Sequence, residues 1–328
     1  MINKIRIFRT LTTDPHWNLA LEKQLMDTTP QGCCTLYLWQ NQNTVVIGRN
    51  QNAWAECRTT LLSDEGGKLA RRLSGGGAVF HDLGNLNFTF LMDKDDYDLD
   101  KQLSVIIKAC ELAGIHAEKS GRNDLLAEGC KFSGNAFYSN KTHAYHHGTL
   151  LVNVDMDKLS RYLSPSKAKL ASKGVASVRS RVVNLSQLAP ELTIDKMAAH
   201  MAAAFQQVYG CGTEEVTLTG TDLQTIAATA EEYGSWDYLY GTSLPFTFSC
   251  EGRYPWGGML IELDAKNGLI TAAKVYSDSM DWALPAAIEA ALTGCRFELA
   301  AMQDALRAGI DDTEVANDLC VLLSQQQI

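Results

Sequence analysis

The feature that most constrains this chain is a glycine turn between two apolar runs, with two arginines directly before it. The segment reads Leu69-Ala-Arg-Arg-Leu-Ser-Gly-Gly-Gly-Ala-Val-Phe-His-Asp82. Because its three glycines have no Cβ, a ligand can lie against the main chain and the N–H groups can face a phosphate. Arg71 and Arg72 add permanently charged donors for a carboxylate or phosphate. The segment therefore indicates an anion site, with a solvated hairpin turn as the alternative when it is considered alone.

Composition and charge limit the classes of protein and partner. The chain has 328 residues, 46% of them hydrophobic and 20% charged, which suits a packed globular protein with one large and one small domain. Its net charge of −9 argues against nucleic acid or an anionic membrane as a partner, because both need a basic surface. We find no signal peptide and no apolar run long enough to span a membrane. The nine scattered cysteines indicate reduced thiols, so we expect a cytoplasmic protein.

Patterns of apolar residues predict mixed helices and strands in the N-terminal part. Asp14 and Pro15 begin the first helix, since aspartate caps free N–H groups and proline fits the first helical position. Asn18 and Glu22 lie off its apolar face and are expected to be exposed, with a place near a site as the alternative. The runs on either side of a polar turn at 40–43 predict a hairpin. The expected strands are 5–8, 35–39, 44–47, 68–73, 78–81 and 86–92, and further helices are 53–62, 98–114 and 193–209.

A second unit is predicted after a linker at 241–245. The pair Asn267-Gly268 is typical of a hairpin turn. The expected strands are 246–250, 258–263 and 269–276, and the expected helices are 285–292, 299–307 and 313–323. We find no catalytic cluster in this unit. The sequence therefore predicts a catalytic domain over 1–244 and a small accessory domain over 245–328.

Polar residues follow the glycine turn at two places. Gly121-Arg-Asn-Asp124 puts an amide and a carboxylate on a short turn. A carboxylate beside a phosphate repels it unless a cation lies between them, which favours Mg²⁺, with an Asx turn as the alternative. Cys130-Lys-Phe-Ser-Gly134 places Lys131 at the start of a strand, where its ammonium group either enters a cleft or is a solvated surface group.

Two histidines and a basic segment complete the candidates. His146 and His147 are neighbours on a predicted strand, so they point to opposite faces and suit a metal poorly. One of them is expected to pack beneath a ligand. Residues 167–184 are basic within an acidic protein, which indicates a mobile loop that closes over an anionic ligand, with a solvated loop as the alternative.

Together these segments resemble the lipoate–protein ligases of the bacterial A type, which have a small accessory domain after the catalytic one. The resemblance covers essentially the whole chain and is carried by five blocks in order: 71–82, 121–124, 131–134, 147–149 and 173–184. It implies an α+β fold, with a mostly antiparallel sheet flanked by helices as in biotin ligases and class II synthetase cores, followed by a small α/β accessory domain.

The resemblance also implies the reaction. Lipoate would attack the α-phosphate of ATP, in the presence of Mg²⁺, to give lipoyl-AMP and pyrophosphate. The lipoyl group would then pass to a lysine on the lipoyl domain of a 2-oxoacid dehydrogenase E2 subunit or on the glycine-cleavage H protein. A monomeric enzyme that salvages exogenous lipoate is the expectation.

Roles for individual residues follow from the same resemblance. Lys131 would be the catalytic residue that bridges the lipoate carboxyl and the α-phosphate, and Asp124 would hold the metal. The residues expected to bind ATP are Arg72, Gly77, Ala78, Val79, Phe80, Asn123, Asp124, Lys131, Lys173 and Val178. Those expected to bind lipoate are Leu19, Val46, Arg71, Ser74, Gly76, Lys131 and His147.

Three other functions are alternatives. Octanoyltransferases share the fold but use a cysteine nucleophile, in one branch near the position of Lys173 and Gly174, where this chain has none. Cys130 is the nearest thiol, and strand alternation predicts that it faces away. A biotin ligase would have a different glycine-rich motif. A binding protein without chemistry is disfavoured because the lysine, the arginines and the Asn-Asp pair are all present.

Overall fold

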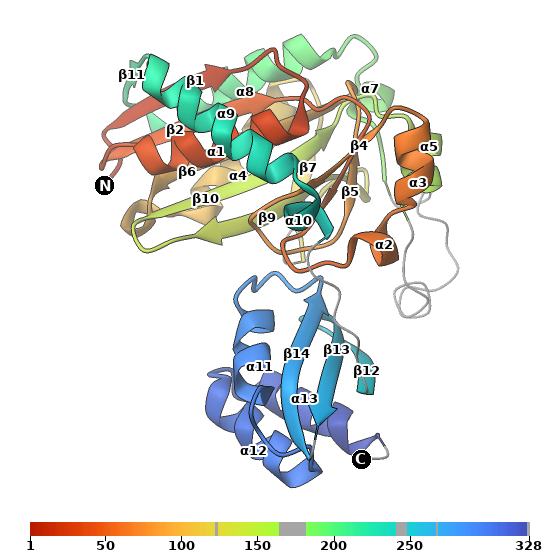
Figure 1. Ribbon diagram of the computed structural model, residues 1–328. Coiled ribbons are helices and arrows are strands. Elements are labelled where there is room, and N and C mark those ends of the chain that lie inside the picture. Colours follow the sequence, from red (N-terminus) through yellow and green to blue (C-terminus); the bar gives the residue numbers. More distant parts are fainter. Residues whose placement is uncertain (122–123, 164–181, 241–247, 267, 327–328) are drawn as a thin grey trace.

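The computed structural model describes residues 1–121, 124–163, 182–240, 248–266 and 268–326 (Figure 1). Among these residues, eight strands form one sheet in the order β11-β1-β2-β6-β10-β9-β8-β7. Only β11–β1 and β1–β2 are parallel pairs there, so the predicted mostly antiparallel α+β fold is confirmed. The strands are β1 (Lys4–Arg9), β2 (Cys33–Trp39), β6 (Asn85–Asp93), β7 (Ala117–Ser120), β8 (Asp124–Ala127), β9 (Cys130–Ser139), β10 (His143–Leu151) and β11 (Gly212–Glu214).

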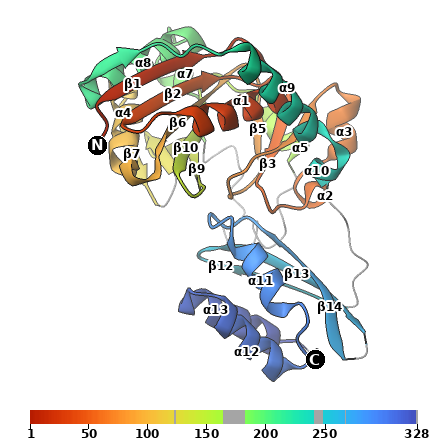
Figure 2. The same ribbon diagram turned by 60° about the vertical axis from the view of Figure 1, so that its left-hand side comes forward.

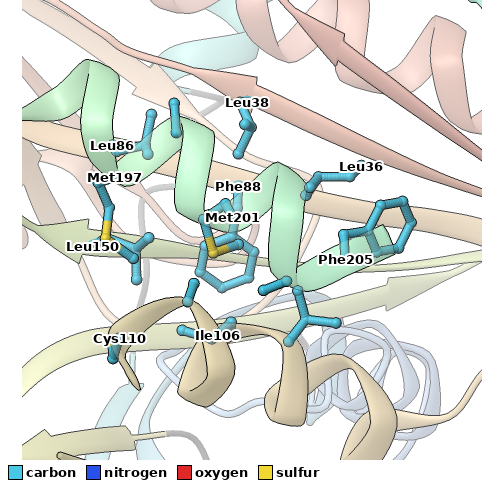
Figure 3. Packing of buried hydrophobic residues seen from close by; sticks show 14 of the residues in the cluster. Leu36, Leu38, Leu86, Phe88, Ile106, Cys110, Leu150, Met197, Met201 and Phe205 are labelled. Carbon is cyan, nitrogen blue, oxygen red and sulfur yellow. The ribbon is translucent and has the colours of Figure 1, made fainter. Parts of the chain in front are cut away.

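Helices cover both faces of this sheet because the side chains of its central strands alternate between two apolar cores. Leu36 and Leu38 of β2 face α4 (Leu99–Leu112) and α8 (Ile194–Tyr209), where Met201 and Phe205 fill the core (Figure 3). The intervening aromatic residues of β2 belong to a second core, beneath α1 (Pro15–Thr28) and α9 (Gly220–Gly234). This second core borders the candidate site.

The start of α1 agrees with its prediction. The Asp14 carboxylate accepts a hydrogen bond from the Trp17 N–H at 3.0 Å, and Pro15 occupies the first turn. Asn18 and Glu22, however, are not exposed: their side chains are 0% and 2% accessible. Both side chains lie against the sheet, because the buried face of α1 is wider than the stripe formed by its apolar residues.

The predicted hairpin of 35–39 with 44–47 is wrong. The second of these segments, β3 (Thr44–Ile47), forms a separate three-stranded sheet with β4 (Lys68–Arg71) and β5 (Val79–His81), in the order β4-β3-β5. Both edges of β2 are already taken by β1 and β6, so the fully buried β3 must find its partners elsewhere. The glycine turn consequently joins two strands that flank β3 and do not pair with each other.

The predicted helix over 53–62 is interrupted. It divides into α2 (Ala53–Glu56) and α3 (Thr59–Asp64), because the main chain at 57–58 bonds to the end of another helix. The Arg58 N–H donates to the Tyr162 carbonyl at 2.9 Å. The remaining elements of this unit are η1 (Lys94–Asp96), α5 (Met156–Tyr162), α7 (Leu185–Leu188) and α10 (Trp236–Tyr240).

The C-terminal unit forms a separate lobe in both views (Figure 1, Figure 2). Its strands make an antiparallel sheet that shares one apolar core with its helices, and the predicted hairpin of the last two strands is confirmed. The predicted domain boundary after residue 244 lies outside the described residues. The elements are β12 (Phe248–Tyr254), β13 (Gly257–Lys266), β14 (Leu269–Ser277), α11 (Leu284–Leu292), α12 (Leu299–Gly309) and α13 (Thr313–Ser324).

Candidate functional site

The buried side chain of Arg72 holds the glycine turn through hydrogen bonds to its main chain. Its buried guanidinium donates to the carbonyl oxygens of Gly75 at 2.7 Å and Gly77 at 2.8 Å, and its Nε donates to Ser74 Oγ at 3.1 Å. A third carbonyl, that of Val46, accepts at 3.2 Å. Burial lowers the pKa of Arg72 to about 10, so the group stays charged at neutral pH. The turn is thus held by one buried cation whose donors face main-chain oxygens.

Arg71 points to a different set of acceptors. Its side chain donates to the carbonyl of Arg49 at 2.9 Å and to that of Gln51 at 2.7 Å. It also reaches the carbonyls of Tyr238 and Leu239 in α10. In this structure Arg71 therefore ties the segment after β3 to α10, and a role in binding lipoate stays a prediction.

The outer side of the glycine turn contacts the C-terminal unit. The Gly76 N–H donates to the carbonyl of Ser279 at 3.0 Å, and Gly76 has a φ of +86°. A Cβ on Gly75 would lie 2.3 Å from that same carbonyl oxygen, so only glycine allows the contact. Trp282 continues the interface by packing against Arg49 and Tyr138.

The residues after the turn differ in exposure. Gly77, Ala78 and Val79 are half-buried, whereas the Phe80 ring is buried against Tyr162 at 5.5 Å between ring centroids. A nucleotide at this place would therefore meet main-chain groups of the segment and not the Phe80 ring.

Ser74, His147 and Glu22 form a buried chain of hydrogen bonds. Ser74 Oγ lies 2.8 Å from His147 Nε2, and His147 Nδ1 lies 2.8 Å from Glu22 Oε1. Thr89 accepts from Trp39 Nε1 at 3.1 Å and therefore donates its hydroxyl hydrogen to Glu22 Oε1 at 2.7 Å.

The direction of these bonds follows from the chemistry of the groups. When the imidazole is neutral, the Glu22 carboxylate accepts from the Nδ1–H of His147, and His147 Nε2 accepts from Ser74. Hydrolases connect a serine nucleophile in this way. Here Ser74 Oγ also accepts from Arg72 and is completely buried, so the chain fixes the orientation of Ser74 and His147.

The sequence favours an exposed position for Glu22 and places it near a site only as the alternative. The signal was available, because Glu22 follows Leu19 by three residues and neighbours it on one face of a helix. Leu19 and Val46, two predicted lipoate contacts, are buried in the same core as Tyr145. The structure therefore brings together Leu19, Val46, Ser74 and His147.

Lys131 and Asp124 form an ion pair at the start of β9 and β8. Lys131 Nζ lies 2.6 Å from Asp124 Oδ1, and each side chain is about one-third exposed. A Cβ on Gly134 would lie 3.1 Å from Lys131 Nζ, so the glycine leaves room for the lysine to fold across its strand. The Val183 N–H donates to the Lys131 carbonyl at 2.9 Å, which brings the end of the basic segment next to the lysine.

The donor set at Asp124 suits Mg²⁺ bound together with a substrate. Mg²⁺ keeps several waters and takes one or two carboxylates plus phosphate oxygens, so a single carboxylate is sufficient. Among the described residues no group of three His, Cys, Asp or Glu side chains could hold a metal by itself. Asn123, Lys173 and Val178, the other predicted ATP contacts, lie outside the described residues.

No described helix has both the length and the apolar character needed to cross a bilayer.

Burial raises the pKa of the thiols of Cys57 and Cys110 to about 12, which makes them poor nucleophiles. Cys130 is half-buried.

Comparison with known proteins gives two family matches and several similar structures. The family model described as lipoyl protein ligase A/B catalytic domain matches residues 14–206. The model described as bacterial lipoate protein ligase C-terminus matches residues 243–318.

Three solved structures share the fold. LipL1 of P. falciparum in complex with lipoate has 24% identity and a TM-score of 0.85, over 98% of this chain and 100% of that one. The lipoate protein ligase of a bipartite system from Thermoplasma acidophilum, reported with its E2 lipoyl domain, has 25% identity and a TM-score of 0.65 over 76% and 100%. A lipoate-protein ligase A bound with ATP has 24% identity and a TM-score of 0.64 over 74% and 99%.

Proposed function

The chain belongs to the lipoyl protein ligase A/B family and carries the bacterial lipoate protein ligase C-terminal domain, and on this premise we propose that it is an ATP-dependent lipoate–protein ligase. It converts lipoate and ATP to lipoyl-AMP and pyrophosphate. It then transfers the lipoyl group to a lysine of lipoyl domains, on E2 subunits or on the glycine-cleavage H protein. The solved relatives that are reported with lipoate, with ATP or with an E2 lipoyl domain support this proposal.

The observation that carries the proposal is the position of Lys131 at one end of a buried polar and apolar face. On β10, Thr149 lies about 7 Å from His147 on the same side of the sheet. Thr149 Oγ1 accepts from the Gly134 N–H at 3.3 Å, beside Lys131, and His147 contacts Ser74 of the glycine turn. One face therefore connects the lysine, the glycine turn and the core that contains Leu19 and Val46.

This arrangement suits the first step. A carboxylate oxygen forms a bond to the α-phosphorus while the bond to pyrophosphate breaks, so two anions must approach each other. Lys131 offsets the negative charge where it accumulates. Asp124 would hold Mg²⁺, which supplies further positive charge to the phosphates when bound.

The second step needs no protein nucleophile. The acceptor lysine amine attacks the acyl carbonyl of lipoyl-AMP, and AMP leaves with the bonding electrons. Holding the two reactants together accounts for the rate. We expect the basic residues 167–183 to shield the adenylate from water, a prediction in which residues 167–181 lie outside the described part.

The first test is ATP–pyrophosphate exchange by the full chain, with and without lipoate. Exchange that requires lipoate is the expected result, because pyrophosphate re-enters ATP only if lipoyl-AMP forms reversibly. Lipoate binding without any exchange would contradict adenylation. It would leave an ATP-independent transferase or a binding protein, which differ in whether an octanoyl carrier donates its acyl group.

Replacing Glu22 by Gln tests the chain of hydrogen bonds. The glutamine amide can donate an N–H to His147 Nδ1. The variant therefore no longer determines which imidazole nitrogen carries the hydrogen and which one accepts from Ser74. We expect kcat/KM for lipoate to fall about tenfold, as for the loss of one buried hydrogen bond. Asp27→Asn, which changes a more exposed carboxylate of the same helix paired with Lys23, is the matched control and should stay within about twofold of wild type. An unchanged Glu22→Gln enzyme would contradict this role.

A further inference from the structure

Tyr145 carries a buried hydroxyl group without a hydrogen-bond partner among the described residues. The side chain is completely buried on β10. Burial raises the pKa of Tyr145 well above its usual range, so the group remains a neutral donor. Buried polar groups almost always have partners, and in a chain whose proposed function requires an acyl substrate, an unpaired one is a place where the ligand can supply the partner.

A neighbouring tyrosine shows the ordinary arrangement. Tyr37 on β2 belongs to the same core and is equally buried. Its hydroxyl lies 3.3 Å from Asn18 Oδ1 and donates to it. A partner is therefore available to some tyrosine hydroxyls of this core, whereas those of Tyr145 on β10 and Tyr233 on α9 have none among the described residues.

The strand β10 places Tyr145 at a defined distance from the lysine. Tyr145, His147 and Thr149 share one face, and two residues of a strand advance about 6.6–6.8 Å, so Tyr145 lies about 13 Å along the strand from Thr149. Thr149 adjoins Lys131 through Gly134, and His147 adjoins the glycine turn. Of these three residues, Tyr145 is thus the farthest from the lysine along the strand.

The length of the acyl substrate matches this distance. An eight-carbon acyl chain with bonds of about 1.5 Å extends about 10 Å. An acid whose carboxylate lies beside Lys131 therefore brings its far end close to Tyr145. In lipoate that end is a five-membered disulfide ring, whereas in octanoate it is a methyl group.

We propose that the Tyr145 hydroxyl selects the far end of the acyl chain and favours the disulfide ring of lipoate over the methyl end of octanoate. This inference rests on the proposed function. The ring sulfurs are weak hydrogen-bond acceptors and pack well against aromatic rings. The rings of His147 and Tyr138 lie 4.7 Å and 5.4 Å from the Tyr145 ring. A methyl group accepts no hydrogen bond, so octanoate leaves the hydroxyl unpaired and dehydrated.

The test compares wild type with Tyr145→Phe and with Tyr37→Phe as the matched control. Acid-dependent ATP–pyrophosphate exchange gives kcat/KM for lipoate and for octanoate. We expect Tyr145→Phe to shift the lipoate-to-octanoate ratio about five- to tenfold toward octanoate, and Tyr37→Phe to leave the ratio unchanged. Thermal unfolding is the second measurement: Tyr145→Phe should keep or raise the melting temperature, whereas Tyr37→Phe, which leaves Asn18 without its donor, should lower it.

The outcomes separate this inference from the proposed function. A ratio for Tyr145→Phe within about twofold of wild type, or a melting temperature that falls as far as that of Tyr37→Phe, overturns the inference while the ligase proposal stands. Wild type that shows no exchange with either acid overturns the proposed function, and the inference falls with it.

Discussion

Lys131→Ala is expected to lower lipoate-dependent ATP–pyrophosphate exchange at least about a hundredfold. The Lys131 ammonium has Asp124 as its ion-pair partner and lies at the end of the face where a carboxylate and a triphosphate would meet. In the variant, no positive charge at position 131 offsets the repulsion between the lipoate carboxylate and the triphosphate. Since the effect is on a developing charge, the loss should be mainly in kcat and less in KM for lipoate.

A matched variant makes this result specific. Lys119→Ala removes another partly exposed lysine, on β7 next to the strand of Asp124, whose ammonium group is paired with the Asp100 carboxylate at 3.0 Å. It should exchange at the wild-type rate. A Lys131→Ala protein that stays folded by circular dichroism and retains exchange within a few-fold of wild type would remove Lys131 from the proposed chemistry.

Arg72→Ala should have the largest effect on stability. The variant leaves the carbonyls of Val46, Gly75 and Gly77 without the donors they have now, inside the protein. Each buried carbonyl left without its donor costs about 1–3 kcal/mol, and three carbonyls are affected. Urea unfolding of the full chain, monitored separately for exchange activity and for helicity, should show activity lost at the lower urea concentration, because the glycine turn opens first.

The control for Arg72→Ala is Arg58→Ala, which removes an exposed arginine at the start of α3. Its unfolding midpoint should stay within about 0.5 kcal/mol of wild type. If Arg72→Ala were as stable as this control, the turn would be held by its own main-chain conformation and not by the guanidinium.

The sequence alone predicts most of the fold, since the long helices and the C-terminal elements follow from periodicity and turn residues. It predicts the hairpin of β13 and β14 from Asn267-Gly268, but not the pairing of the N-terminal strands. The segments 35–39 and 44–47 look like a hairpin, and only the competition for the edges of β2 sends β3 to a different sheet. That pairing is set by distant parts of the chain, which local patterns do not contain.

Only some residues of the candidate site can be predicted from the sequence, for a similar reason. Glycines, arginines and Lys131 stand out because their residue types suit anions in any context. Glu22 and the Tyr145 hydroxyl do not, because an acidic residue on a helix and a tyrosine in a strand are ordinary until burial and missing partners are known. Their roles depend on which elements cover them, and this is visible only in three dimensions.

The proposed function is tested most directly by the mass of an acceptor. The full chain is incubated with lipoate, MgATP and an apo lipoyl domain that an established ligase can modify, and the intact mass of that domain is followed. We predict the addition of one lipoyl group on one lysine, only when lipoate and ATP are both present. An unchanged mass, or an addition that does not require ATP, would contradict a lipoate–protein ligase.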